Sequence, residues 1–213
     1  MLKIDLHTHS TQSPDGGISE AQYEQVLELK KIDVIAITDH DSIQLALKLN
    51  TKFGHQVIVG EEIMTNQGEI IGLFLTKKVE PGMDLADTIK AIKDQGGIVY
   101  LPHPFEKVRK GISMANLEKV TEHIDIVEVY NARAVRQGKG IEATKWARMN
   151  SKATAASSDA HGVKGLGSAY SMVKEKPTRD NLVKLMKTSK LEMHRPPLRT
   201  LLYPKLNRLR GRK

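Results

Sequence analysis

Short apolar runs rich in β-branched residues recur along the chain and alternate with amphipathic segments. Several of these runs are apolar throughout, which is typical of strands that are buried on both faces of a sheet. We expect strands at residues 3–6, 34–38, 57–59, 70–75, 98–101, 126–129, 153–156 and 169–173.

The segments between these runs carry helix-start signals. Ser19 and Gln22 form a capping box ahead of Tyr23, Val26 and Leu27, an i, i+3, i+4 apolar stripe. Three more helices are expected to begin after capping residues, which are Asp84, Ser113 and Thr178.

Strand–helix alternation over nearly two hundred residues predicts an α/β fold with a parallel sheet, open or closed into a barrel. The 213 residues contain no internal repeat and no Gly/Ser-rich linker. We therefore expect one domain over residues 1–194, followed by a separate C-terminal segment, 195–213.

Composition narrows the class of protein further. A hydrophobic content of 39% is enough for a core, and no apolar run is long enough to span a bilayer. The chain has no cysteine, which excludes disulfides and thiolate metal sites, and its start lacks the pattern of a signal peptide. We expect a cytoplasmic protein.

The net charge of +8 is concentrated at the C-terminal end. Residues 195–213 hold seven Arg/Lys and no Asp/Glu, which leaves the first 194 residues near +1. Such a basic tail can bind nucleic acid or an anionic surface, or it can be a solvated end without a function.

Polar side chains follow one predicted strand after another. Five of the eight histidines lie at these strand ends. In a (β/α) barrel the carboxyl ends of the strands form one mouth, so the side chains would converge there. The residues concerned are His7, His9, Asp39, His40, Glu61, Glu62, His103, Glu128, Asn131, Asp159 and His161.

Imidazole and carboxylate ligands without sulfur suit Zn²⁺, Mn²⁺ or Fe²⁺. A catalytic zinc uses about three protein ligands, so this larger set predicts two or three divalent ions that share carboxylates. Clustered ions activate water and neutralise charge on attacking and leaving oxygens. Hydrolysis of a phosphate ester suits such a centre best.

The motifs "DLHTHS" with Asp15-Gly16, "ITDHD", "GEE", "HPF", "EVYN" and "SSDAH" resemble, in this order, the PHP (polymerase and histidinol phosphatase) family of metallophosphoesterases. The resemblance runs from Ile4 to about Val173. It implies a distorted seven-stranded (β/α) TIM-like barrel with a two- or three-metal centre at its mouth.

The resemblance also implies roles for single residues. It makes Asp39 a residue that orients a ligand. Glu61 is adjacent to the position that matches the family's glutamate ligand, and its side chain points elsewhere if the segment is extended. Glu62 is expected to bridge two ions. The implied metal ligands are His7, His9, Asp15, His40, Glu62, His103, Asp159 and His161.

At two places the chain departs from the family pattern or leaves alternatives. Glu69 stands where some relatives have a ligand histidine, and it is either a ligand or a supporting or exposed residue. Either Glu128 or Asn131 can face the ions, and we favour Glu128 as a ligand. The remaining histidines fall away from strand ends and are expected to be structural or exposed: His55, His123 and His194.

Cations are also needed for the phosphate oxygens. Arg133 is the first choice, with Arg109 and Lys110 as further candidates, because Arg forms bidentate contacts with phosphate. Asp15, Asp159 and His161 are the expected catalytic groups, which hold the attacking water and assist the leaving group.

The small phosphorylated substrate is expected to be a nucleotide, a nucleoside bisphosphate or a short oligonucleotide. One alternative is a nucleic-acid-binding module that acts through the basic tail. The other is a metal hydrolase that cleaves an amide or ring bond on the same barrel, because a fold does not determine the chemistry.

Overall fold

A computed structural model describes residues 1–134 and 138–211. In this part of the chain the strands form one nine-stranded sheet in the order β7-β6-β5-β4-β3-β2-β1-β8-β9. The strands are β1 (Leu2–Asp5), β2 (Val34–Ile37), β3 (Val57–Thr65), β4 (Gly68–Leu73), β5 (Ile98–Leu101), β6 (Ile126–Asn131), β7 (Ala153–Ser157), β8 (Ala169–Val173) and β9 (Lys190–Met193).

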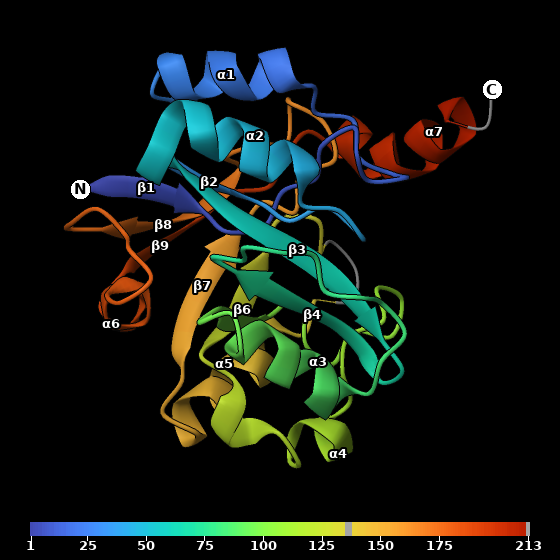
Figure 1. Ribbon diagram of the computed structural model, residues 1–213, viewed down its shortest axis with the longest axis vertical. Coiled ribbons are helices and arrows are strands. Elements are labelled where there is room, and N and C mark those ends of the chain that lie inside the picture. Colours follow the sequence, from blue (N-terminus) through green and yellow to red (C-terminus); the bar gives the residue numbers. More distant parts are fainter. Residues whose placement is uncertain (135–137, 212–213) are drawn as a thin grey trace.

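Helices connect the strands and cover the outside of the curled sheet (Figure 1). None of those in the described ranges has the length and apolarity that a bilayer crossing requires. They are α1 (Glu20–Glu28), α2 (Gln44–Phe53), α3 (Leu85–Lys93), α4 (Met114–Leu117), α5 (Gly140–Met149), α6 (Leu182–Lys187) and α7 (Tyr203–Arg210), with 3₁₀ turns at Gly54–Gln56, Thr121–His123 and Leu198–Leu202.

The expectation of seven parallel strands is wrong in its detail, because the sheet is larger and mixed. β3 turns back at Thr65 and Gly68 and pairs antiparallel with β4, and a connection of two residues permits no other direction. β4 also pairs antiparallel with β5, and β8 with both β1 and β9. β3 is longer than predicted because Glu61 and Glu62 interrupt its apolar run, although both are buried in the strand.

The local helix signals agree with the structure where they are strongest. Ser19 caps α1, and both hydrogen bonds of the capping box with Gln22 are present. Asp84 caps α3 by accepting a hydrogen bond from the Ala86 N–H. The helix expected after Thr178 begins later, at Leu182, after a turn in which Thr178 and Asn181 exchange hydrogen bonds.

The core has two main layers, which follow the alternation of side chains along the strands. One layer lies between the sheet and the helices and includes Ile35 and Ile37 of β2. The other contains their neighbours Val34 and Ala36, together with Leu182 of α6. Both faces of β2 are therefore buried, as its continuous apolar run predicted.

The sheet nearly closes into a barrel where β7 approaches β8. The Ser171 hydroxyl accepts a hydrogen bond from the Ala156 N–H at 3.1 Å. At the carboxyl end the chain after β1 pairs directly with the chain after β7, through a parallel bridge between Thr8 and Ala160. The His9 N–H donates to the Ala160 carbonyl at 2.9 Å within this bridge.

A buried carboxylate supports the same junction. Asp5 accepts hydrogen bonds from the Ser158 N–H at 3.0 Å and the Gly167 N–H at 3.3 Å. Burial raises the pKa of Asp5 to about 6, so the side chain is ionised above that pH and accepts both bonds. Asp5 thereby connects β1 to the segments on both sides of the barrel seam.

We predict that Asp5→Ala lowers the free energy of unfolding by about 2–4 kcal/mol, because two buried N–H groups lose their acceptor. Chemical denaturation at pH 7.5 measures this change. The control is Asp180→Ala at an exposed position, which should shift stability by no more than about 0.5 kcal/mol. Equal stability of the two variants would contradict the role of Asp5 at the seam.

Candidate metal centre

The side chains that follow the strands converge on the carboxylate of Glu62. Glu62 Oε2 lies 3.2 Å from His7 Nε2, 3.1 Å from His9 Nε2 and 3.6 Å from His40 Nε2. Glu62 Oε1 lies 3.0 Å from His103 Nε2. One buried carboxylate thus contacts four imidazoles from three separate segments of the chain.

The histidines are oriented so that Nε2 points into the cluster. Glu128 Oε1 lies 3.1 Å from Nδ1 of His7, and Ser13 Oγ lies 3.2 Å from Nδ1 of His9. His161 directs Nδ1 to the Asp159 carbonyl at 2.9 Å. When Nδ1 is held by a neighbour, the other ring nitrogen is fixed in place for a metal ion.

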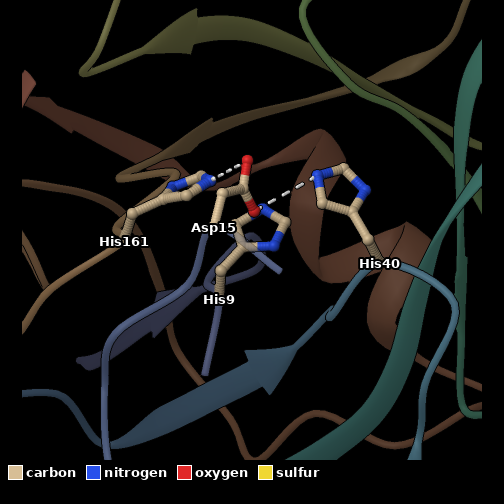
Figure 2. Close-up of side chains that lie close together, drawn as sticks. All are labelled: His9, Asp15, His40 and His161. Carbon is tan, nitrogen blue, oxygen red and sulfur yellow. Dashed lines mark ion pairs between the residues drawn. The ribbon is translucent and has the colours of Figure 1, made fainter. Parts of the chain in front are cut away.

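Asp15 forms a second focus of the cluster, near His9, His40 and His161 (Figure 2). Its carboxylate lies between two rings, 3.5 Å from His161 Nε2 and 3.8 Å from His40 Nε2. Asp15 Oδ1 is buried and has no hydrogen-bond partner among the described residues. A buried acceptor without a donor is costly in a folded protein, and a cation at this position would satisfy it.

Three overlapping groups of these side chains bring ligand atoms within 4.8 Å of one another. His7 and His9 each belong to two groups. The donors are imidazole nitrogens and carboxylate oxygens, which fits the expected divalent ions. The groups are His9, Asp15, His40 and His161; His7, Glu62 and His103; and His7, His9 and Asp159.

The electrostatics show how strongly the cluster needs positive charge. Burial alone would lower the pKa of His7, but the charges of Glu62, Asp159 and Glu128 outweigh it and raise that pKa well above its usual value. Burial likewise opposes protonation of His9, yet hydrogen bonds to Asp159 and Glu62 raise its pKa to about 9. Protons on these rings therefore balance the carboxylates in the metal-free protein.

The pKa values of Glu62 and Glu69 are shifted in opposite directions. Burial would raise the pKa of Glu62, but His7 and His40 hold it well below its usual range. Glu69 lies further from the imidazoles, 3.7 Å from His103 Nε2. Burial and the charges of Glu62 and Asp159 raise the pKa of Glu69 to about 9, so it carries a proton at neutral pH.

His161 differs from His7 and His9. Burial, together with the positive charges of His9 and Arg133, lowers the pKa of His161 to about 3. The ring is therefore neutral at physiological pH. A neutral imidazole is the form that binds a metal ion.

Two networks of supporting side chains hold the cluster. Asp39, the predicted orienting residue, accepts hydrogen bonds from the Ser10 N–H at 2.6 Å and the Ser13 hydroxyl at 2.9 Å. Glu128 accepts from the Tyr100 hydroxyl at 3.0 Å and from the His103 N–H at 2.8 Å. Ser13 and Tyr100 were missed by the sequence analysis, although Tyr100 stands within the strand that leads to "HPF".

Backbone strain accompanies the cluster. His103 and Asp159 have positive φ angles of 27° and 49°, a region that residues other than glycine seldom adopt. Such conformations cost about 1–3 kcal/mol each and persist where the surroundings hold them. The contact of His103 with Glu62 and that of Asp159 with the arginines described next provide that restraint.

A cavity of about 570 Å³ opens over the cluster and is bordered by cationic side chains. Arg109 donates to Asp159 at 2.8 Å and to Asn131 at 2.6 Å. Arg133 donates to Asp159 at 3.1 Å, and Lys110 also lines the cavity. Both predicted phosphate-binding arginines therefore lie at the mouth, where each is paired with Asp159.

The histidines expected to lie elsewhere do so. His55, His123 and His194 are exposed. Glu61 points away from Glu62 and accepts a hydrogen bond from the Val79 N–H at 2.8 Å. The roles of the converging residues as ligands, catalytic groups and phosphate contacts stay predictions, and the structure supplies their proximity.

The C-terminal segment also contributes to the site, which the sequence analysis did not anticipate. Asn207 donates to the Asp15 carbonyl at 2.9 Å, and Arg208 Nη2 lies 2.6 Å from Asp15 Oδ2. No local sequence signal connects position 208 with position 15. Two residues counted in the basic tail, Arg212 and Lys213, lie outside the described residues.

Two proteins of Methanocaldococcus jannaschii are related to this chain in sequence. Uncharacterized protein MJ0417 is 36% identical over 173 residues, which cover 79% of this chain and 69% of that protein. Uncharacterized protein MJ1587 is 37% identical over 145 residues, which cover 62% of this chain and 82% of that protein. Residues 142–190 match a family model described as PHP-associated. The chain belongs to the PHP family.

Solved structures with the same fold are more distant in sequence. A two-domain protein containing a predicted PHP-like metal-dependent phosphoesterase from Bacteroides vulgatus has a TM-score of 0.70 at 20% identity, over 97% of this chain and 69% of that one. An amidohydrolase from Chromobacterium violaceum has a TM-score of 0.60 at 15% identity, over 94% and 96%. The lesion-specific endonuclease PfuEndoQ from Pyrococcus furiosus has a TM-score of 0.58 at 15% identity, over 89% of this chain and 57% of that one. At these identities the likeness concerns the PHP fold alone.

We predict that binding of Zn²⁺ or Mn²⁺ releases about two or more protons at pH 7.5, because His9 and Glu69, with pKa values of about 9, must lose their protons to become ligands. Because protons compete with the ion for these side chains below their pKa of about 9, the affinity for the metal ion should rise from pH 6 to pH 8.5. Titration calorimetry in two buffers of different ionisation enthalpy measures the proton count.

The control for this titration is His123→Ala, which removes an exposed histidine and should change neither affinity nor proton release. A metal affinity that stays constant between pH 6 and 8.5 would contradict the assigned protonation states.

Proposed function

We propose that this PHP protein is a metal-dependent phosphoesterase that hydrolyses a small phosphorylated, nucleotide-like substrate. The observation that carries the proposal is the contact of four imidazoles with Glu62 beneath a cavity bordered by arginines. Carboxylates and imidazoles suit divalent ions, and guanidinium groups suit phosphate oxygens. The names of the neighbours from B. vulgatus and P. furiosus, a phosphoesterase and an endonuclease, agree with this chemistry.

The proposed ligands are His7, His9, Asp15, His40, Glu62, Glu69, His103, Asp159 and His161, which would hold two or three ions. Glu128 was also predicted as a ligand, but its oxygens already bond to Nδ1 of His7 and to the His103 N–H, which favours a supporting role. Divalent ions in such a centre supply an activated water and neutralise charge on the phosphate. Glu62 is the proposed bridging ligand, because its two oxygens face different histidines.

The chain's own side chains would position the reactants. Arg133 and Arg109 are the proposed contacts for the phosphate oxygens, and both already lie at the cavity. Asp15 and Asp159 are proposed to accept hydrogen bonds from the attacking water. Against the effect of burial, the contact with His161 lowers the pKa of Asp15 and the charge of Arg133 lowers that of Asp159, so both remain ionised.

His161 was predicted as a catalytic group as well as a ligand. Its pKa of about 3 means that the ring is not protonated to the acidic imidazolium form at neutral pH in the metal-free protein, so it is a poor general acid. This favours the ligand role for His161. Assistance to the leaving group then falls to another group at the mouth.

We predict that Glu62→Gln lowers turnover of a phosphomonoester at least about a hundredfold and lowers metal content, because an amide cannot bridge two ions through charged oxygens. A panel of phosphomonoesters, phosphodiesters and amides, assayed after metal reconstitution, measures the effect. The control is Glu61→Gln, one residue along the same strand but bonded to Val79, which should keep its metal and its turnover.

The same panel tests the proposed bond specificity. Amide cleavage without phosphoester cleavage would favour the other type of metal hydrolase. If turnover by the wild-type protein does not exceed that of the double variant His7→Ala, His9→Ala, the proposal that the protein is an enzyme is rejected.

Nucleic-acid binding by the basic segment 195–213 remains a second proposal, because Arg199, Lys205 and Arg210 are exposed there. Deletion of the segment does not test it cleanly, since Asn207 and Arg208 contact the catalytic mouth. Point substitutions leave those contacts intact.

We predict that alanine at Arg199, Lys205 and Arg210 together weakens binding of a single-stranded oligonucleotide. The log–log salt slope should fall by about 2, since three fewer phosphates are neutralised. Fluorescence anisotropy at several salt concentrations measures the slope. The control removes the same charge elsewhere on the surface, at Lys174, Lys176 and Lys187, and an equal loss there would show a general charge effect instead.

A further inference from the structure

Helix α7 is attached to the mouth of the barrel by one side-chain amide. Asn207 Nδ2 donates to the Asp15 carbonyl at 2.9 Å and to the His161 carbonyl at 3.0 Å. Asp15 and His161 come from opposite ends of the PHP domain sequence. Asn207 therefore connects α7 to both loops at once, and α7 lies beside the N-terminal loop in Figure 1.

Two glycines leave the space that α7 occupies. A Cβ atom added at Gly17 would lie 2.6 Å from Asn207 Nδ2, and one added at Gly162 would lie 2.4 Å from Tyr203 Cδ2. Real Cβ atoms do not approach other atoms this closely. The loops after β1 and β7 thus accept α7 in this position only because both residues lack a side chain.

The placement of α7 brings Arg208 into the cavity over the cluster. Arg208 lines that cavity together with Pro204, and its Nη2 lies 2.6 Å from Asp15 Oδ2. The side chain is 60% exposed, against 15% for Arg109 and 18% for Arg133. Arg208 is therefore the most solvent-accessible of these three guanidinium groups.

The three arginines also differ in how fully they are bonded. Arg109 uses Nε, Nη1 and Nη2 for contacts with Glu106, Asn131 and Asp159. Within the described residues, the hydrogen bonds of Arg208 involve Nη2 alone. Its remaining N–H donors are available for an anion that enters from solvent.

We propose that Arg208 is a substrate-binding residue that contacts the phosphate oxygens at the open side of the cavity, and that α7 is a wall of the active site. The inference rests on the proposed phosphoesterase function and adds to it a residue from the C-terminal segment. Arg208 can exchange Asp15 for a phosphate oxygen because both are anionic oxygen acceptors within reach of one guanidinium group.

The test compares Arg208→Ala and Arg208→Lys with Arg148→Ala, which removes an exposed arginine of α5 to which no role is assigned. Three quantities are measured on metal-loaded protein: KM and kcat for a phosphomonoester, the Kd of inorganic phosphate by calorimetry, and the metal content. Arg208→Ala should raise KM and the phosphate Kd about tenfold to a hundredfold, the effect of losing a charge-assisted hydrogen bond. Metal content should stay unchanged.

Arg208→Lys should recover part of the affinity, because lysine keeps the charge but lacks the planar fork. Asn207→Ala should also raise the phosphate Kd, since the attachment that places Arg208 is lost. Retention of wild-type phosphate affinity by Asn207→Ala would overturn the role of α7 as a wall.

Two results would overturn the role of Arg208. One is a KM and phosphate Kd for Arg208→Ala equal to those of Arg148→Ala. The other is loss of metal with unchanged phosphate affinity, which would make Arg208 a support for Asp15. If the wild-type protein hydrolyses no phosphoester, the proposed function fails, while the phosphate titration still decides whether Arg208 binds the anion.

Discussion

The charge of a buried carboxylate must be compensated, and in this protein four imidazole rings from three segments of the chain compensate that of Glu62. His7, His9, His40 and His103 all direct Nε2 toward it. Burial by itself would lower the pKa of His7, His9 and His40, and the carboxylates reverse that tendency for His7 and His9. The arrangement is stable only while cations, either protons or metal ions, occupy the space between the groups.

This constraint explains why so many hydrogen bonds hold the side chains at the mouth of the barrel in place. Asp39 with Ser10 and Ser13, and Glu128 with Tyr100, hold the rings at their Nδ1 atoms or through the adjacent backbone. Positive φ angles at His103 and Asp159 are tolerated for the same reason. The bracing costs conformational freedom and yields a site whose Nε2 atoms are already aimed at one place, which reduces the cost of binding ions.

The sequence predicted most strands and the segments that carry the cluster, because apolar runs and the polar residues after them are local signals. It did not predict the β3–β4 hairpin, because Glu61 and Glu62 interrupt the apolar pattern of β3, although both residues are buried in that strand. β9 was also missed, since its short and partly exposed residues carry no strong pattern. The contacts of Asn207 and Arg208 join residues more than 190 positions apart from Asp15, and only the folded chain reveals them.

The Thr8–Ala160 bridge has a consequence for the order of folding. It joins segments about 150 residues apart in the chain, and it sets His7 and His9 beside Asp159 and His161. Contacts of such long sequence separation form late, because the entropy of closing the intervening loop must be overcome first. A nascent chain that ends before residue 159 lacks both Asp159 and His161, two of the proposed ligands, so the proposed metal site would be complete only after these late contacts have formed.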